Sequence, residues 1–132
     1  MEDELRAAVR IMQDGGAEFC DARYQDSRTL LIVVSNRELR TMSNGRLAGV
    51  GLRARIGGSW GFAASASTDR KSIEEMARKA VRAAKAGDCP GRRIPEQPAR
   101  TGSYRARGRI PPASVPIEEK LAMACICWSR PR

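Results

Sequence analysis

A glycine-rich stretch in the middle of the chain is the first candidate for chemistry. Residues 49–63 read GVGLRARIGGSWGFA and contain five glycines. A dinucleotide-binding loop needs G-x-G-x-x-G between a strand and a helix, whose N-terminus then faces the pyrophosphate. Here no third glycine follows Gly49 and Gly51 at that spacing, strand-like alternation continues, and no Lys-Ser or Lys-Thr completes a P-loop. The stretch therefore favours a β-hairpin turning at Gly57-Gly58, whose other glycines mark bulges or the close approach of another backbone.

Side chains suited to acid–base or metal chemistry are scarce. The 132 residues include no histidine, the commonest metal ligand and the commonest general base. Cys125-x-Cys127 offers two thiolates where a structural zinc takes four ligands, and the cysteine spacings fit neither a CxxC pair nor a disulfide framework. We expect the four cysteines to be free thiols and the chain to bind no cofactor. No acid–base pair can be named from the isolated carboxylates Asp21, Asp26 and Asp69.

A basic tail raises the alternative of nucleic-acid binding. The formal net charge is +9, and its excess is concentrated in residues 88–132. Residues 104–109, YRARGR, resemble the arginine–glycine segments that bind RNA by charge and stacking, with a steep dependence on salt. A solvated linker explains the same composition and is the favoured interpretation. The contacts under the alternative are Arg92, Arg93, Arg100, Arg105, Arg107 and Arg109.

Two amphipathic helices are predicted. Apolar residues spaced from Leu5 to Met12 form one stripe, which Gly15-Gly16 ends. A second stripe follows the capping-box spacing Ser72-x-x-Glu75, and its helix ends at Gly87. The members of the second stripe are Ile73, Met76, Ala77, Ala80, Val81 and Ala84.

The region between these helices has the pattern of an antiparallel sheet. Alternation or β-branched residues predict strands at residues 19–26, 29–34, 38–43, 47–56 and 59–64. Turns are expected at Asn36-Arg37, at Asn44-Gly45, which is the strongest short hairpin signal, and at Gly57-Gly58. The expected fold class is α+β: an antiparallel meander of four or five strands with two helices on one face and an extended C-terminal tail.

Composition divides the chain into three segments. Residues 1–87 are expected to form the α+β domain, residues 88–116 a Pro/Arg-rich linker, and residues 117–132 a truncated start of the following segment. No stretch is long and apolar enough to span a membrane, and the acidic N-terminus does not resemble a secretory signal. A cytoplasmic location is therefore expected.

The residue pattern resembles a known family. Four segments together are similar to the N-terminal domain of the TldD/PmbA proteins: Ala17–Arg28, Gly49-Val-Gly-Leu-Arg53, Trp60-Gly-Phe-Ala63 and the helix from Ser72 to Ala86. The glycine-flanked hairpin resembles the TldD branch more than the PmbA branch. These proteins are described as modulators of DNA gyrase and as zinc-dependent peptidases. The resemblance implies an α+β domain of a metallopeptidase.

The resemblance does not carry catalysis onto this chain. The family's zinc ligands lie in a His-Glu-x-x-x-His helix and a later cysteine, beyond the position that matches Val115–Leu121, and none of them is present here. The resemblance therefore implies zinc only in a further C-terminal domain, a chain that is inactive alone, and a truncated, frameshifted or naturally short product. The expected role is to pair with a homo- or heterodimer partner of the same family, or to wall a peptide cleft. Its partner- or cleft-facing residues would be Gly49, Gly51, Trp60, Gly61 and Phe62.

Overall fold

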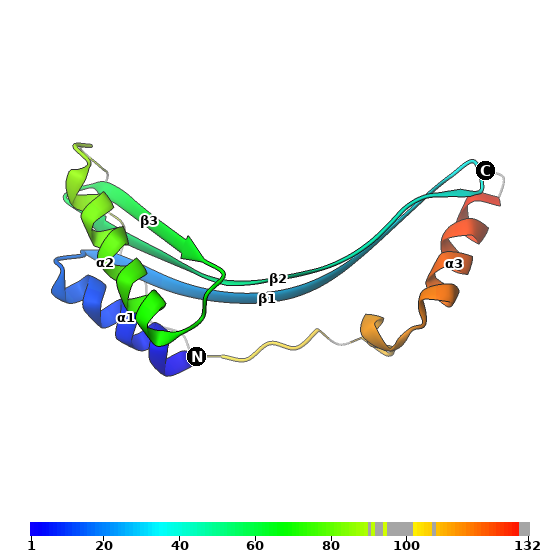
Figure 1. The fold of residues 1–132 in the computed structure, drawn as a ribbon, viewed down its shortest axis with the longest axis horizontal. Coiled ribbons are helices and arrows are strands. Elements are labelled where there is room, and N and C mark those ends of the chain that lie inside the picture. Colours follow the sequence, from blue (N-terminus) through cyan, green and yellow to red (C-terminus); the bar gives the residue numbers. More distant parts are fainter. Residues whose placement is uncertain (90, 92–93, 95–101, 107, 130–132) are drawn as a thin grey trace. The chain divides into compact units, whose positions relative to one another are not determined.

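The computed structural model describes residues 1–89, 91, 94, 102–106 and 108–129. Figure 1 shows the order of the elements along the chain. The helices are α1 (Glu2–Asp14), α2 (Arg70–Ala86) and α3 (Ile117–Ser129), with a short 3-10 helix η1 at Pro112–Ser114. The strands are β1 (Phe19–Ser35), β2 (Glu38–Ile56) and β3 (Ser59–Ser65).

The three strands form one sheet in the order β1-β2-β3. Asn36 and Arg37, at φ 53° and 64°, connect β1 to β2, and Gly57 and Gly58, at φ 57° and 91°, connect β2 to β3. Positive φ at both central residues is the requirement of a type I′ turn, which suits a two-residue hairpin. Two of the three turns expected from the sequence are therefore confirmed.

The prediction of a third turn at Asn44-Gly45 is wrong, and the predicted number of strands is therefore wrong as well. Both residues lie inside β2, and Gly45 has no positive φ. Asn36-Arg37 closes the hairpin first, so β1 runs alongside β2 at this point, and the Arg46 guanidinium reaches Asp26 of β1 at 2.8 Å. Pairing along the strands prevails over the local turn preference of Asn-Gly. Two pairs of expected strands thus merge, leaving three instead of four or five.

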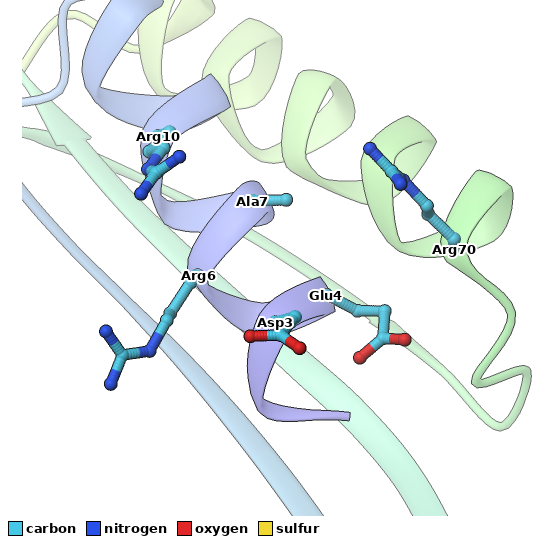
Figure 2. Close-up of a pocket in the computed structure, with 6 residues that line it drawn as sticks. All are labelled: Asp3, Glu4, Arg6, Ala7, Arg10 and Arg70. Carbon is cyan, nitrogen blue, oxygen red and sulfur yellow. The ribbon is translucent and has the colours of Figure 1, made fainter.

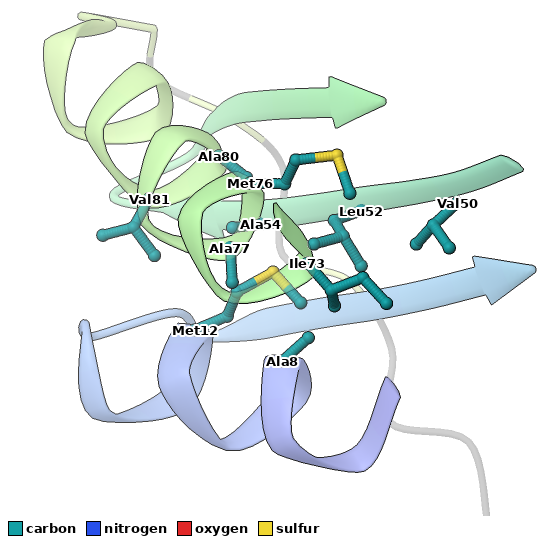
Figure 3. Packing of buried hydrophobic residues seen from close by; sticks show 10 residues of the cluster. All are labelled: Ala8, Met12, Val50, Leu52, Ala54, Ile73, Met76, Ala77, Ala80 and Val81. Atoms are coloured by element: carbon teal, nitrogen blue, oxygen red, sulfur yellow. The ribbon is translucent and has the colours of Figure 1, made fainter. Parts of the chain in front are cut away.

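The helices α1 and α2 cover one face of the sheet (Figure 3). All six expected stripe residues of α2 are buried, and Ala8 and Met12 of α1 are buried beside them. From β2, Val50, Leu52 and Ala54 point into the same core, because alternate residues of a strand share a face. The expectation of an α+β fold with two helices on one face is confirmed.

The start of α2 differs from the predicted capping box. The cap is Asp69, whose carboxylate accepts a hydrogen bond from the Ser72 backbone N–H at 2.9 Å. An aspartate at this position satisfies one of the free N–H groups of the first turn. The helix therefore begins at Arg70, before the expected Ser72.

The chain divides into two compact units. One comprises residues 1–27 and 46–97 and contains the core just described, and the other comprises residues 28–45 and 98–132. In the second unit α3 continues to Ser129, so the expectation of an extended C-terminal tail is wrong for this segment. In the described part of the chain, no helix has the length and apolar character needed to cross a membrane.

Candidate functional site

The sheet face opposite α1 and α2, here called the outer face, carries two exposed aromatic side chains. Within β3, Ser59 and Gly61 are buried on the helix side, whereas Trp60 and Phe62 alternate with them and are 50% and 64% exposed. Opposite them on β2 stand Arg55 and Arg53, respectively. Large exposed apolar groups gathered on one face are typical of an interaction surface.

Residues of β1 and β2 hold Trp60 in place. The Phe19 ring meets the Trp60 ring edge-on, with the centroids 5.7 Å apart and the planes at 71°. The Arg53 guanidinium lies 5.7 Å from the Trp60 ring centroid, within the range of a cation–π contact. Three strands thus contribute to one cluster around a single tryptophan.

Asp21 of β1 fixes the orientation of Arg53. The Arg53 Nε donates to Asp21 Oδ1 at 3.1 Å and to Oδ2 at 2.9 Å. This hydrogen bonding raises the pKa of the Arg53 guanidinium above its ordinary value. Because the pair is exposed, it contributes little to stability, but it keeps the cation beside the tryptophan.

A second ion pair borders the outer face near the β2–β3 turn. Arg55 is only 6% exposed, and its Nη1 donates to Glu18 Oε2 at 2.9 Å. The Glu18 carboxylate also accepts from the Gly57 backbone N–H at 3.1 Å, which ties the turn to the start of β1. Arg55 therefore holds Glu18 in position at the end of the sheet that contains the β2–β3 turn.

The three glycines expected to face a partner lie in different surroundings. A Cβ on Gly51 would stand 3.6 Å from the Phe62 ring, on the outer face. A Cβ on Gly49 would come within 2.7 Å of the Ser65 carbonyl oxygen, so this glycine allows β2 and β3 to approach. A Cβ on Gly61 would lie 1.9 Å from the Ala80 carbonyl oxygen of α2. The structure thus groups Gly51 with Trp60 and Phe62, and places Gly61 on the opposite face.

Sequence reasoning missed Phe19, Asp21 and Arg53. Their signal was present in the alternation of residues 19–25, which puts Phe19 and Asp21 on one side of a strand. What the sequence did not supply was the strand order that brings this side next to Arg53 and Trp60.

The basic residues considered for nucleic-acid binding are only partly described. Arg105 and Arg109 are exposed and lie in the second unit. Arg92, Arg93, Arg100 and Arg107 lie outside the described residues.

A hollow of about 270 Å³ lies beside α1 and the start of α2 (Figure 2). Arg6 and Arg10 line it from α1, with Asp3 and Glu4 on the same helix, and Arg70 lines it from α2. Arg6 is already paired with Glu2 at 2.7 Å. Because carboxylates stand among these guanidinium groups, the hollow has no uniform charge that would favour an anion.

The described residues form no ligand group for the zinc that the resemblance implies for the family. Nowhere in the described ranges do three or more His, Cys, Asp or Glu side chains gather to hold a metal ion. Cys20, Cys89 and Cys125 form no disulfide, as expected for these three, while the side chain of Cys127 lies outside the described part. Burial raises the pKa of the Cys20 thiol, whose Sγ lies 3.8 Å from the Val9 carbonyl oxygen, so it packs as a core group.

Comparison with known proteins identifies the domain that carries the outer face. Residues 20–84 match the sequence profile described as PmbA/TldA metallopeptidase domain 1. This segment belongs to the first domain of the PmbA/TldD family. It contains β2, β3, nearly all of β1 and most of α2, and therefore every member of the Trp60 cluster except Phe19.

Two similar proteins extend the comparison beyond the segment that matches the PmbA/TldD family. A protein named metalloprotease, from Methanothermobacter thermautotrophicus, is 33% identical in an alignment over 106 residues that covers 78% of this chain and 22% of that protein. The crystal structure of TldE from Thermococcus kodakarensis superimposes with a TM-score of 0.57 at 20% identity, over 83% of this chain and 23% of TldE. The structural likeness shows the fold. The chain spans less than a quarter of the length of either protein.

Proposed function

We propose that this chain acts as a non-catalytic first domain of a PmbA/TldD-type metallopeptidase, and that its outer face packs against the part of the peptidase that carries the zinc. Through this contact the domain would wall the peptide cleft or pair subunits. The observation that supports the proposal is the aromatic cluster around Trp60 on the exposed face of a domain that belongs to this family.

The composition of the outer face suits a docking role. Tryptophan and arginine are enriched among the residues that dominate binding energy at protein interfaces. Trp60 and Arg53 contact each other and are held by Phe19 and Asp21, so little side-chain freedom would be lost when a partner covers them. Gly51 adds a place without a side chain next to the Phe62 ring, where a partner can approach the strand.

The residue types in this chain support the proposal that another domain or subunit supplies the catalytic groups. Peptide hydrolysis at a zinc centre needs three protein ligands and a general base. This chain has no histidine, and its described carboxylates on the outer face are engaged with arginines, as in the Asp21–Arg53 pair. The chemistry would therefore come from another domain or subunit, with this chain contributing shape.

A chimeric peptidase tests the proposal. The segment of the Methanothermobacter metalloprotease that matches this chain is replaced by the corresponding residues of this chain, and peptide hydrolysis is measured. We expect an active chimera whose activity falls by more than about tenfold when Trp60→Ser and Phe62→Ser are introduced together, because the exposed aromatic anchors are lost.

The matched control is Arg78→Ser, on the solvent side of α2, whose arginine side chain is 57% exposed. It should leave the activity of the chimera within about twofold, since exposed ion pairs contribute little. A folded chimera that is inactive, or one that tolerates the loss of both aromatic rings, would rule out docking through the outer face.

A further inference from the structure

The outer edge of β3 has free main-chain groups in a regular array. Within the described residues β3 pairs with β2 alone. The two-residue turn at Gly57-Gly58 makes Ile56 and Ser59 a hydrogen-bonded pair, and such pairs alternate along an antiparallel ladder. Gly61 and Ala63 therefore bond toward β2. Trp60, Phe62 and Ala64 direct their N–H and C=O groups to the opposite edge.

The residues of β3 itself have no charge, proline or bulge of the kind that usually prevents strand pairing. Soluble proteins protect edge strands with charged side chains, proline, bulges or covering segments. Residues 59–65 read SWGFAAS and contain neither a charge nor a proline, and the register with β2 runs without a bulge from Ser59 to Ser65. The edge is thus a template for another strand.

A second copy of this domain does not fit there. The close approach of Gly61 to the Ala80 and Ala84 backbone places α2 directly over β3. A copy paired antiparallel through its own β3 would bring its α2 to the same side of the sheet, one strand spacing of about 4.8 Å away. Packed helices need about 8–10 Å between their axes. The edge accepts a strand that has no helix above it.

A groove beside the edge indicates the kind of strand that fits. It has a volume of about 450 Å³, and Phe62 to Ser65 form one wall while the flank of α2 forms the other. The charged residues of that flank, Glu75 and Lys79, are paired with each other at 3.0 Å, so the groove has no net charge to attract a charged segment. The remaining α2 side chains along it are Ser72, Met76 and Ala83.

We infer that the β3 edge binds an extended, uncharged segment of another polypeptide chain by strand addition. The main chain of the segment hydrogen-bonds to Trp60, Phe62 and Ala64. Its side chains alternate between the outer face beside Phe62 and the groove under α2. This site shares Phe62 with the proposed docking surface of the outer face but differs in its main contacts, which are the main-chain groups of the β3 edge and the α2 flank. Strand addition can therefore be tested apart from the docking of the outer face.

A synthetic strand tests the inference on the full chain. The probe is a seven-residue peptide of alternating threonine and valine with blocked ends, added at millimolar concentration to the isotope-labelled chain. The amide protons of Trp60, Phe62 and Ala64 should shift and exchange more slowly with solvent, because they become hydrogen-bonded. The amides of Gly61 and Ala63, already bonded to β2, should change little.

Two controls separate strand addition from other binding. The same peptide N-methylated at two adjacent central residues loses a donor from each of its edges and should bind more weakly by roughly three- to tenfold. Ala64→Pro, which removes one outward N–H, should weaken binding to a similar degree, whereas Ala64→Thr keeps the donor and should bind normally.

Three outcomes would overturn the inference. The methylated peptide could perturb the spectrum as strongly as the unmodified one, or the three amides could stay unprotected at saturating peptide. The same amides could also become protected without peptide as the chain is concentrated, which would identify a second copy as the occupant. The peptide comparison stands even if Ala64→Pro fails to fold. The readout is main-chain hydrogen bonding in the chain with Trp60 and Phe62 intact, so the outcome of the chimera test does not decide it.

Discussion

At the scale of single residues, Gly61 shows how close contact between α2 and β3 constrains the sequence. The ideal Cβ position is 1.9 Å from the Ala80 carbonyl oxygen and 2.5 Å from the Ala84 nitrogen, both of which are backbone atoms that cannot move alone. Alanine at this position would therefore push the helix away from the strand. The glycine is required by packing, since its φ is not in the positive range.

We predict that Gly61→Ala lowers the free energy of unfolding by about 3 kcal/mol, in the upper range for overpacked cores. Gly51→Ala is the matched control on the neighbouring strand, because its Cβ would meet Phe62 at an ordinary 3.6 Å. Gly51→Ala should change stability by less than about 1 kcal/mol. Urea unfolding followed by circular dichroism measures both, and equal stability of the two variants would contradict the packing of α2 on Gly61.

The capping of α2 by Asp69 makes the stability of the protein depend on pH. Its carboxylate accepts hydrogen bonds from the Ser67 hydroxyl and from the Ser72 backbone N–H, and these bonds hold the pKa of Asp69 far below its usual value. A carboxyl group with a lowered folded pKa stabilises the protein above its unfolded pKa of about 3.9, and the contribution is lost as the pH falls below that value.

The variant Asp69→Asn keeps a capping oxygen but removes the charge. It should have a lower Tm than the wild type at pH 7, and the difference should shrink as the pH falls below about 4. Thermal unfolding at a series of pH values makes the comparison. A difference that stays constant between pH 7 and pH 2 would show that the charge of Asp69 contributes nothing to the cap.

At the scale of elements, α1 and α2 were predictable from the sequence, whereas α3 was not and the strands were predictable only in part. The stripe from Ile73 to Ala84 identifies the buried face of α2 because a helix repeats its face locally, every three or four residues. Strand limits depend on the partner strand. Asn44-Gly45 has the local signature of a turn, but β1 lies beside it and extends β2 through both residues.

The position of Gly45 inside β2 gives a direct test. No atom lies within 4 Å of its ideal Cβ position, and its φ is not positive, so threonine fits there and favours a strand. We predict that Gly45→Thr raises the free energy of unfolding by about 0.5–1 kcal/mol. Gly57→Thr, at φ 57°, should lower it by about 1 kcal/mol or more. A destabilising Gly45→Thr would indicate a turn at Asn44-Gly45 after all.

At the scale of the whole molecule, only some residues of the outer face could be predicted from the sequence. The sequence predicted that Trp60, Phe62 and Gly51 face a partner or cleft. That role stays a prediction, but the structure groups the three residues on one exposed face. The sequence did not join Phe19, Asp21 and Arg53 to them, because these residues come together through pairing of segments more than thirty positions apart. It also did not separate Gly61, whose surroundings depend on where α2 lies over the sheet.

The comparisons assign residues 20–84 to the first domain of the PmbA/TldD family, whereas the contribution of this domain to peptide hydrolysis stays a proposal. The matched segment covers β2 and β3 completely, and the chain spans 22% of the length of its metalloprotease relative. If the proposal holds, the bond-breaking groups belong to another domain or subunit, and this chain provides a surface. Its residues would then affect catalysis only through the packing of the complete peptidase.

Peptide hydrolysis by the purified chain alone is the most direct test of this division of labour. The chain is incubated with a mixture of unstructured peptides, with and without added zinc, and the products are followed by mass spectrometry. We expect no cleavage above that in buffer under either condition. Cleavage that is abolished by a chelator and restored by zinc would show that the chain carries the catalytic groups itself, and would contradict the proposal.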